Sequence, residues 1–301
     1  MDILVSDAEK MYIINGAEEG MRADGRGVFD YRPIIVETGV LPTTNGSARV
    51  RLASTDLLIG VKAELTTVTN LEEYRNRINF FVDCSANATP LFVGRGGEDI
   101  GEEVASVLDA AYDNPYVLPD LKSLILSPMH VWKLFVDIVI LECGGNLIDA
   151  ASIGISDNGE EICKHIRLYH YLFQVKAALQ NTEICNVSVQ PGDQGKSIVE
   201  VLEDNSVWKF DISRAPLIVS VHKLGEANLV DASLTEEACS RCTLSVAVSP
   251  SVSDSREEDV FADEMTRLSV RMVHSLQKAL DRRLKEESED VNADPLLTFL
   301  M

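Results

Sequence analysis

The sequence has no long hydrophobic run. No stretch of its 301 residues reaches the roughly 18 consecutive apolar residues that a membrane-spanning helix needs. The N-terminus, MDILVSDAEKMYIINGAEEG, has acids where a secretory signal has basic residues, and its apolar run is too short for the hydrophobic part of a signal. We therefore expect a soluble intracellular protein without a membrane partner.

Basic residues are scarce as well. Lysine and arginine total 27 against 48 aspartates and glutamates, so the formal net charge is -21 at pH 7. A chain this acidic repels polyanions at long range, which argues against a general nucleic-acid coat protein. Basic residues nevertheless outnumber acidic ones locally in segment 21–62. Any contact with a phosphate backbone would therefore have to be local.

The cysteines lack the spacing of a disulfide framework, which indicates reduced thiols in a cytosolic or nuclear compartment. Cys239 and Cys242 form a lone CxxC with no second pair of ligands nearby, so we expect no zinc site there. His165 and His170 lie five residues apart, off a common helical face, and are interpreted as ordinary side chains. The six cysteines are Cys84, Cys143, Cys163, Cys185, Cys239 and Cys242.

The residues that are present predict a globular protein of about two domains, because 46 % are apolar and 25 % are charged. Ser6 followed by Glu9 is a capping-box signature for a short helix that ends near Gly16 or Gly20. Partly alternating apolar runs then predict four strands, most simply a meander. These strands are expected in 33–41, 47–54, 56–65 and 77–86.

Segment 96–112 has apolar residues at helical spacing and is predicted to pack on that sheet. A strand at 131–143 and a small-residue helix from 146 follow, which gives an α+β order. A second set of strands, with a short helix or turn from 234, leads to a long amphipathic helix at 256–287. Segment 157–175 interrupts the small-residue helix and is interpreted as a loop with its own short helix. The second set of strands is expected in 185–192, 197–205, 207–213 and 215–225.

The turn CGGN at 143–146 joins a strand to a helix, an arrangement that holds phosphate in many proteins. It lacks the GxGxxG spacing and the lysine of the P-loop, so a nucleotide-binding enzyme is poorly supported. We interpret Gly144 and Gly145 as residues that permit a tight turn and close packing.

Several separated motifs resemble the RNase PH family. RADGRG to YRP at 22–33, NGSARVRLASTDLLIGVKAEL at 45–65, NFFVDCSANATP at 79–90, FVGRGG at 92–97 and VDIVILECGGNLIDAAS at 136–152 are similar to its first domain. PLIVSVHKLG at 216–225 and LVDASLTEEACS at 229–240 are similar to its second domain. Within the family, the combination looks like a non-catalytic ring chain of the RNA exosome.

This resemblance implies an α+β, RNase PH-like fold of two βαβ-type domains related by pseudo-symmetry. It divides the chain into an N-terminal helix and turn (1–29), a first domain (30–182) with the insertion 157–175, a shortened second domain (183–287) and a frayed tail (288–301). The family's ring chains lack that insertion and carry an extra hairpin near residue 250.

The resemblance also implies which catalytic positions this chain has lost. Active relatives place a threonine and an arginine after the double glycine, where this chain has Asn146 and Leu147. Arginines on the helix after GRGG correspond to Glu102 and Ser106, and one of two motif aspartates corresponds to Ser233. We therefore expect no catalytic residue, no metal and no cofactor. The alternative is an active phosphate-dependent 3′ exoribonuclease.

The implied function is structural: ring assembly and RNA channelling in 3′-to-5′ RNA processing and degradation, including rRNA maturation and mRNA turnover. The implied partners are other RNase PH-like ring subunits, cap subunits with OB-fold and KH modules, an associated catalytic exoribonuclease and RNA. The implied location is the nucleus with its nucleolus, and the cytoplasm. Arg95 is the leading candidate for RNA contact, followed by Arg26 and Arg51. A structural alternative has Arg26 and Arg32 pairing with Asp24 or Asp30.

Overall fold

The structure is a computed structural model that describes residues 5–68, 77–94, 97–113, 119–152, 178–179, 182–191, 197–201, 207–209, 215–248 and 269. The expected insertion 157–175 and the tail 288–301 lie outside these residues, and only Ser269 of the long helix expected at 256–287 is described. Within the described part, no helix is both long and apolar enough to cross a membrane.

The N-terminal helix α1 spans Asp7–Glu18, as the sequence predicts. Ser6 caps it: the Ser6 hydroxyl accepts from the Glu9 N–H at 3.3 Å, and the Glu9 carboxylate accepts from the Ser6 N–H at 2.9 Å. These reciprocal bonds satisfy backbone donors that the first helical turn would otherwise leave without partners. The capping-box prediction is confirmed.

The largest sheet has the strand order β1-β2-β3-β6-β4, with β5 added to β6. The first three strands pair antiparallel, as in the predicted meander. The prediction that the fourth strand, β4, pairs with β3 is wrong. The strand β6 lies between them and pairs parallel with β4. The strands are β1 Ile34–Thr38, β2 Gly46–Leu52, β3 Thr55–Thr67, β4 Ile78–Cys84, β5 Ile125–Ser127 and β6 His130–Glu142.

Packing explains this order. The strands β3 and β6 have 13 residues each and pair along nearly their whole length. Leu134, Val136 and Ile138 of β6 are each at most 1 % exposed, so burying this strand at the centre removes more apolar surface from water than an edge position would. A partner more than 60 residues along the chain cannot be recognised from local alternation.

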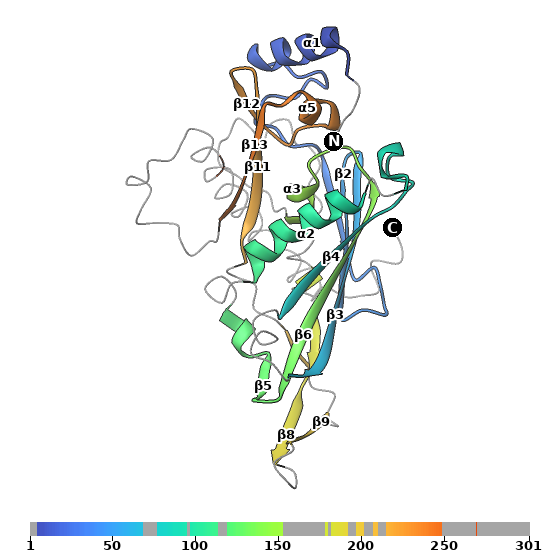
Figure 1. Cartoon of the computed structure of the whole chain (residues 1–301), viewed down its shortest axis with the longest axis vertical. Helices are drawn as coiled ribbons and strands as arrows, with labels where there is room; N and C mark the ends of the chain where they lie inside the picture. The colour runs from blue at the N-terminus through green and yellow to red at the C-terminus, as the bar shows by residue number, and fades with distance from the viewer. Residues whose placement is uncertain are drawn as a thin grey trace, which may run out of the picture.

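Helices α2 (Glu98–Tyr112) and α3 (Leu147–Ser152) lie against the large sheet (Figure 1). The helix α2 also packs against the free edge of β4. Its Gly101 lies so close to this strand that a Cβ there would be 2.6 Å from the Val82 carbonyl oxygen. Asp109 accepts a hydrogen bond from the Phe80 N–H of the same edge. Covering an edge in this way prevents it from pairing with another chain. Short 3₁₀ turns lie at Pro90–Phe92 and Pro119–Lys122.

The rest of the described chain forms small antiparallel sheets. The sheet β12-β11-β13 stands beside α3, with the short helix α5 at its upper end (Figure 1). The short helix or turn predicted from residue 234 is confirmed by α5, and β13 follows it. The elements are β7 Glu183–Cys185, β8 Val187–Pro191, β9 Ser197–Val201, β10 Val207–Lys209, β11 Leu217–Leu224, β12 Ala227–Val230, α5 Leu234–Cys239 and β13 Cys242–Val248.

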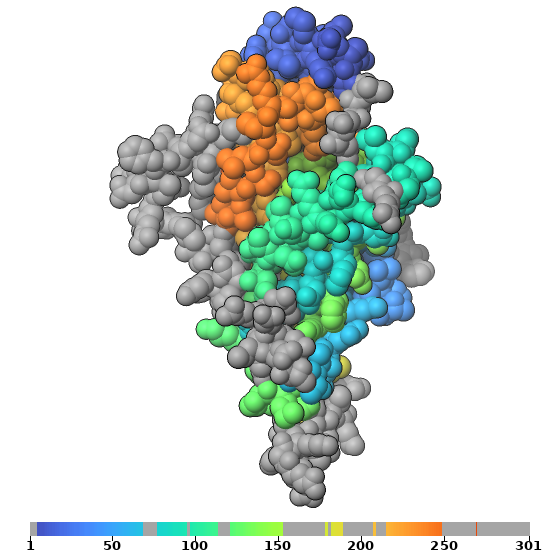
Figure 2. Space-filling model, in the orientation of Figure 1, coloured from blue at the N-terminus to red at the C-terminus, as the bar shows by residue number. Residues whose placement is uncertain are grey.

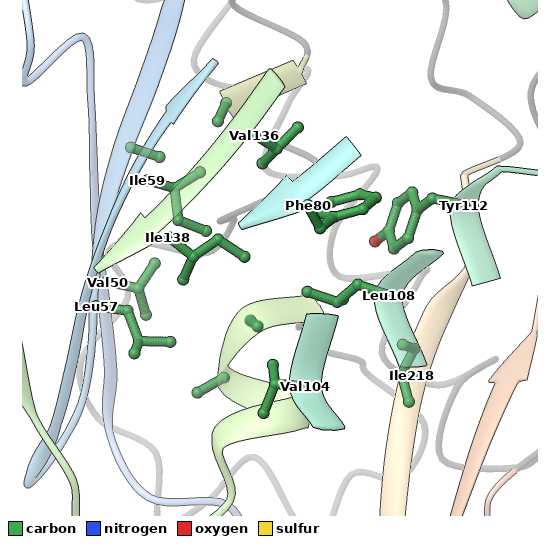
Figure 3. Packing of buried hydrophobic residues seen from close by; sticks show 14 of the residues in the cluster. Val50, Leu57, Ile59, Phe80, Val104, Leu108, Tyr112, Val136, Ile138 and Ile218 are labelled. Carbon is green, nitrogen blue, oxygen red and sulfur yellow. The ribbon is translucent and has the colours of Figure 1, made fainter. Parts of the chain in front are cut away.

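One hydrophobic cluster joins the two predicted domains. Figure 3 shows Val104 and Leu108 of α2 between the large sheet and Ile218 of β11, with Tyr112 facing Phe80. The Tyr112 hydroxyl donates to the Pro216 carbonyl at 3.0 Å, across the same boundary. The domain limits and the pseudo-symmetry stay predictions.

The core position of Leu108, which is fully buried, gives a stability prediction. Replacing Leu108 with Ala should lower the free energy of unfolding by about 2–5 kcal/mol, because it removes packed apolar atoms and leaves a cavity. Urea unfolding followed by circular dichroism measures the change. Ser106→Ala, on the exposed face of the same helix, is the control and should change stability by less than about 0.5 kcal/mol. Equal effects would contradict the assignment of the buried face.

Candidate functional site

The glycine turn between β6 and α3 packs directly on the chain that enters α5. Gly145 has a φ of 94°, and a Cβ there would lie 2.6 Å from the Leu234 nitrogen and 2.8 Å from the Ala232 oxygen. Both atoms belong to the backbone and cannot move aside cheaply. Gly145 is therefore required by close packing, as the sequence interpretation holds.

The amide of Asn146, directly before α3, is bound to a side chain of the protein itself. The Asn146 N–H donates to a carboxylate oxygen (Oε1) of Glu237 at 2.6 Å. Burial raises the pKa of Glu237 above its usual range, while the bond from Asn146 opposes that change. A carboxylate thus stands where a phosphate would be expected to bind.

Asp231 is the centre of the polar contacts beside the turn, and it is fully buried. Its Oδ1 accepts from Arg32 Nη2 at 2.7 Å and from Asn146 Nδ2 at 3.0 Å. Its Oδ2 accepts from the Arg32 backbone N–H at 2.7 Å and from Arg26 Nη1 at 2.9 Å. Burial disfavours the charge of Asp231, but the hydrogen bonds and charge of Arg32 outweigh it and hold the pKa below its usual range.

Arg32 also holds the glycine turn. Its guanidinium donates to the carbonyl oxygens of Gly144 and Gly145 at 2.9 and 3.1 Å. The Thr55 hydroxyl donates to the Gly145 carbonyl at 2.8 Å and accepts from the Gly144 N–H at 3.1 Å. The planar fork of one arginine therefore connects the turn to Asp231.

A second buried arginine binds the same region from the N-terminal side. Arg22 and Glu236 form a bidentate pair, with Nε–Oε1 at 2.9 Å and Nη2–Oε2 at 2.6 Å. Arg22 also donates to the carbonyls of Val230 and Asp231 at 3.0 and 2.7 Å. Burial raises the pKa of Glu236, but Arg22 reverses this, and the net shift is downward. Arg22 thus anchors the N-terminal turn to the strand and helix that flank Asp231.

Asp149 of α3 links the same cluster to β11. This fully buried carboxylate accepts from the Ser220 N–H at 2.7 Å, the Tyr31 hydroxyl at 3.0 Å and Asn146 Nδ2 at 3.2 Å. Burial raises the pKa of Asp149 to about 7, against the effect of these three donors.

The three arginines proposed for RNA contact differ in their surroundings. Arg26 binds Asp24 at 2.6 Å, as the structural alternative holds, and also binds Asp231. Arg51 is about half exposed, with its Nε 3.3 Å from an Asp56 oxygen. Arg95 lies outside the described residues.

The expected pairing of Arg32 with Asp24 or Asp30 is wrong. Arg32 pairs with Asp231, which is 199 positions away in the sequence. Asp24 and Asp30 are close to Arg32 in the sequence, but the fold buries Asp231 next to the backbone of Arg32.

The residues at the positions that the resemblance marks as lost either have structural roles or lie exposed on the surface. Leu147 is 9 % exposed within the core. Glu102 and Ser106 lie on the exposed face of α2. Ser233 is the N-cap residue of α5, and its N–H donates to Glu236 at 2.7 Å.

No group of three or more His, Cys, Asp or Glu side chains among the described residues could hold a metal ion. The thiols of Cys239 and Cys242 are free, with Cys239 buried and Cys242 exposed, and His165 and His170 lie outside the described residues. The sequence interpretation missed the structural roles of Arg22, Glu236 and Glu237. The S-x-x-E spacing of Ser233 and Glu236 is a capping-box signature that could have identified Glu236.

The buried pair gives a first site prediction. Asp231→Asn should lower the free energy of unfolding by about 3–5 kcal/mol, because it leaves the buried charge of Arg32 without its carboxylate. Thermal and urea unfolding measure the loss. Asp24→Asn removes a carboxylate whose side chain is 43 % exposed, and should cost no more than about 1 kcal/mol. If Asp231→Asn were as stable as the wild type, the pair of Arg32 and Asp231 would not contribute to folding stability.

Asp149 gives a prediction about pH. Its pKa is raised to about 7, so between about pH 4 and pH 7 the folded protein holds a proton that the unfolded chain has released. Stability from this group should therefore fall as the pH rises through that range. The stability difference between wild type and Asp149→Asn, measured by urea unfolding at each pH, should decline from pH 4 to 7 and then level off. A constant difference would contradict the prediction.

Comparison with known proteins places this geometry in a family. The model of the 3′ exoribonuclease family, domain 1, matches residues 30–156. A relative from Dictyostelium discoideum, whose name describes it as an exosome complex exonuclease RRP42, is 30 % identical over 292 residues, covering 81 % of this chain and 84 % of the relative. Exosome complex component Rrp42 of Methanopyrus kandleri is 29 % identical over 291 residues, covering 96 % and 97 %.

Solved structures agree on the fold. The Archaeoglobus fulgidus exosome with RNA bound to the active site contains a chain that matches with a TM-score of 0.62 at 24 % identity, over 93 % of this chain and 98 % of that one. A chain of another archaeal exosome core matches with a TM-score of 0.62 at 21 % identity, over 93 % and 96 %. The α+β, RNase PH-like fold is confirmed, and the chain belongs to the RNase PH family of 3′ exoribonucleases, with exosome Rrp42 proteins among its relatives.

Proposed function

We propose that this chain is a non-catalytic structural subunit of an RNA exosome ring. It supports 3′-to-5′ RNA processing and degradation, including rRNA maturation and mRNA turnover, by assembling the ring and channelling RNA. The proposal is supported by relatives that are named as exosome components and match most of the chain. Its formal net charge of -21 also fits a subunit whose RNA contacts are local.

The observation that carries the non-catalytic assignment is the sequestration of Asp231. Phosphorolysis in this family needs fixed cations for phosphate and carboxylates for a metal. Both carboxylate oxygens of Asp231 accept hydrogen bonds from Arg32. Asn146 and Arg26 donate further hydrogen bonds to them. A carboxylate surrounded by two guanidinium groups does not fit a cation, and Ser233 offers no second acid. No step through a metal is therefore assigned to these residues.

The phosphate side of the reaction is also unsupported. Glu237 already accepts the N–H of Asn146, the first amide after the glycine turn, so this donor is not available to a phosphate. Leu147, which follows, is packed in the core and brings no cation. The retained motif thus serves the fold of the turn rather than anion binding.

The proposal extends to partners and location. The ring neighbours are other RNase PH-like chains, with OB-fold and KH cap subunits and a separate catalytic exoribonuclease bound to the assembly. RNA passes through the ring, with Arg95 as the proposed contact. The nucleus with its nucleolus, and the cytoplasm, are the proposed locations.

A phosphorolysis assay tests the catalytic part. The purified chain, incubated with single-stranded RNA, orthophosphate and Mg²⁺, should release no nucleoside diphosphates above a blank without protein. An active RNase PH-type enzyme run in parallel shows that the conditions are sufficient. Release that rises in proportion to the added chain would overturn the proposal and favour the alternative, an active phosphate-dependent exoribonuclease, in line with the exonuclease name of the Dictyostelium relative.

A further inference from the structure

The outer face of α1 and the turn after it expose large apolar side chains. Tyr12 is 70 % exposed, Met21 65 % and Met11 64 %, which makes them three of the four most exposed large hydrophobic residues in the described part of the chain. Figure 2 shows α1 as the blue cap at one end of the molecule, with its outer surface uncovered. Folding of this chain alone leaves these side chains in water.

Helical spacing gathers this surface into one stripe. Ala8, Met11, Tyr12 and Asn15 stand at i, i+3, i+4 and i+7, so they share a face of the helix. None of the four is charged, whereas the solvent face of a surface helix usually carries charged side chains. Tyrosine and methionine are enriched in the cores of protein interfaces. This stripe, together with Met21, is called the α1 face below.

The helix is fixed on its opposite side before any partner binds. Ala17 is buried against β11, β12 and α5. The Glu18 carboxylate accepts from the Glu226 N–H at 2.9 Å, and Gly225 packs so closely on Ile14 that a Cβ would lie 2.8 Å from it. A helix held in this way presents its outer side chains with little further loss of conformational entropy on binding.

Charge selects the kind of partner. Exposed Asp7 and Glu19 stand at the two ends of the α1 face, while Lys10 is half-buried and interacts with Cys239 on the α5 side. With a net charge of -21 for the whole chain, a second copy, RNA and an anionic membrane surface would all be repelled. A partner with an apolar groove and lysine or arginine at the rim of that groove would be complementary to both the apolar stripe and the acidic residues at its ends.

We infer that the α1 face is a docking surface for another protein subunit, which receives Met11 and Tyr12 in an apolar groove with a basic rim. The inference rests on the proposed function in one respect, the existence of partner subunits. It adds which surface of this chain one of them covers and the chemistry of that subunit's groove.

Co-expression tests the inference. The tagged chain is produced together with the RNase PH-like ring subunits and the OB-fold and KH cap subunits of the same organism, and the assembly is recovered by affinity and size-exclusion chromatography. The variant M11E/Y12E places two charges in the groove, so recovery of at least one partner subunit should fall about tenfold or more, as for central interface residues. Circular dichroism and thermal unfolding of this variant should match the wild type, because both side chains are exposed.

The control is S106E/A110E, which adds the same two charges to the exposed face of α2 and should assemble like the wild type. Full assembly by M11E/Y12E would overturn the inference and leave the proposed function standing. Failure of the wild-type chain to assemble with any subunit would overturn the proposed function instead. If sedimentation shows that the isolated wild type dimerises and M11E/Y12E does not, the occupant is a second copy and the inference is wrong.

Discussion

The buried pair of Arg32 and Asp231 connects parts of this molecule that lie 199 positions apart in the sequence. Arg32 precedes β1, Asp231 follows β12, and the glycine turn after β6 is held by the same guanidinium group. A charged pair this deeply buried is stable only if its remaining donors and acceptors are satisfied. Asn146, Arg26 and two glycine carbonyls meet that condition. The turn, the N-terminal segment and the entry to α5 are therefore positioned by one polar cluster.

This cluster also gives the proposed non-catalytic role a physical basis within a fold that other family members use for phosphorolysis. A catalytic carboxylate must be free to bind a cation, and an anion site must have free donors. Here Asp231 is neutralised by guanidinium groups of the same chain, and the amide at the helix start binds Glu237. Groups that bind each other permanently are not available to a substrate. The same residue types thus contribute stability to a subunit whose proposed role is assembly.

Local structure could be read from the sequence where the physics is local. The capping box of Ser6 and Glu9, the helical spacing in α2 and the long apolar run of β6 each involve residues within a few turns or one strand, and each prediction is confirmed. The meander failed at β4 because strand order depends on which buried strand fills the centre of the sheet. The predicted pairing of Arg32 with Asp24 or Asp30 was wrong for a related reason. The acid that burial brings next to Arg32 is distant in the sequence.

The sequence by itself determined several elements, such as α1, α2 and β6, and the family through its ordered motifs. It also determined the absence of a cation at Leu147 and of a second acid at Ser233. These depend on residue identity and short spacing, which do not change on folding. Only the tertiary structure decided that Asp231 is bound by Arg32, that Glu237 occupies the turn and that Met11 and Tyr12 remain exposed. Each of these depends on burial and on contacts across up to 199 positions of the chain, and no local pattern contains that information.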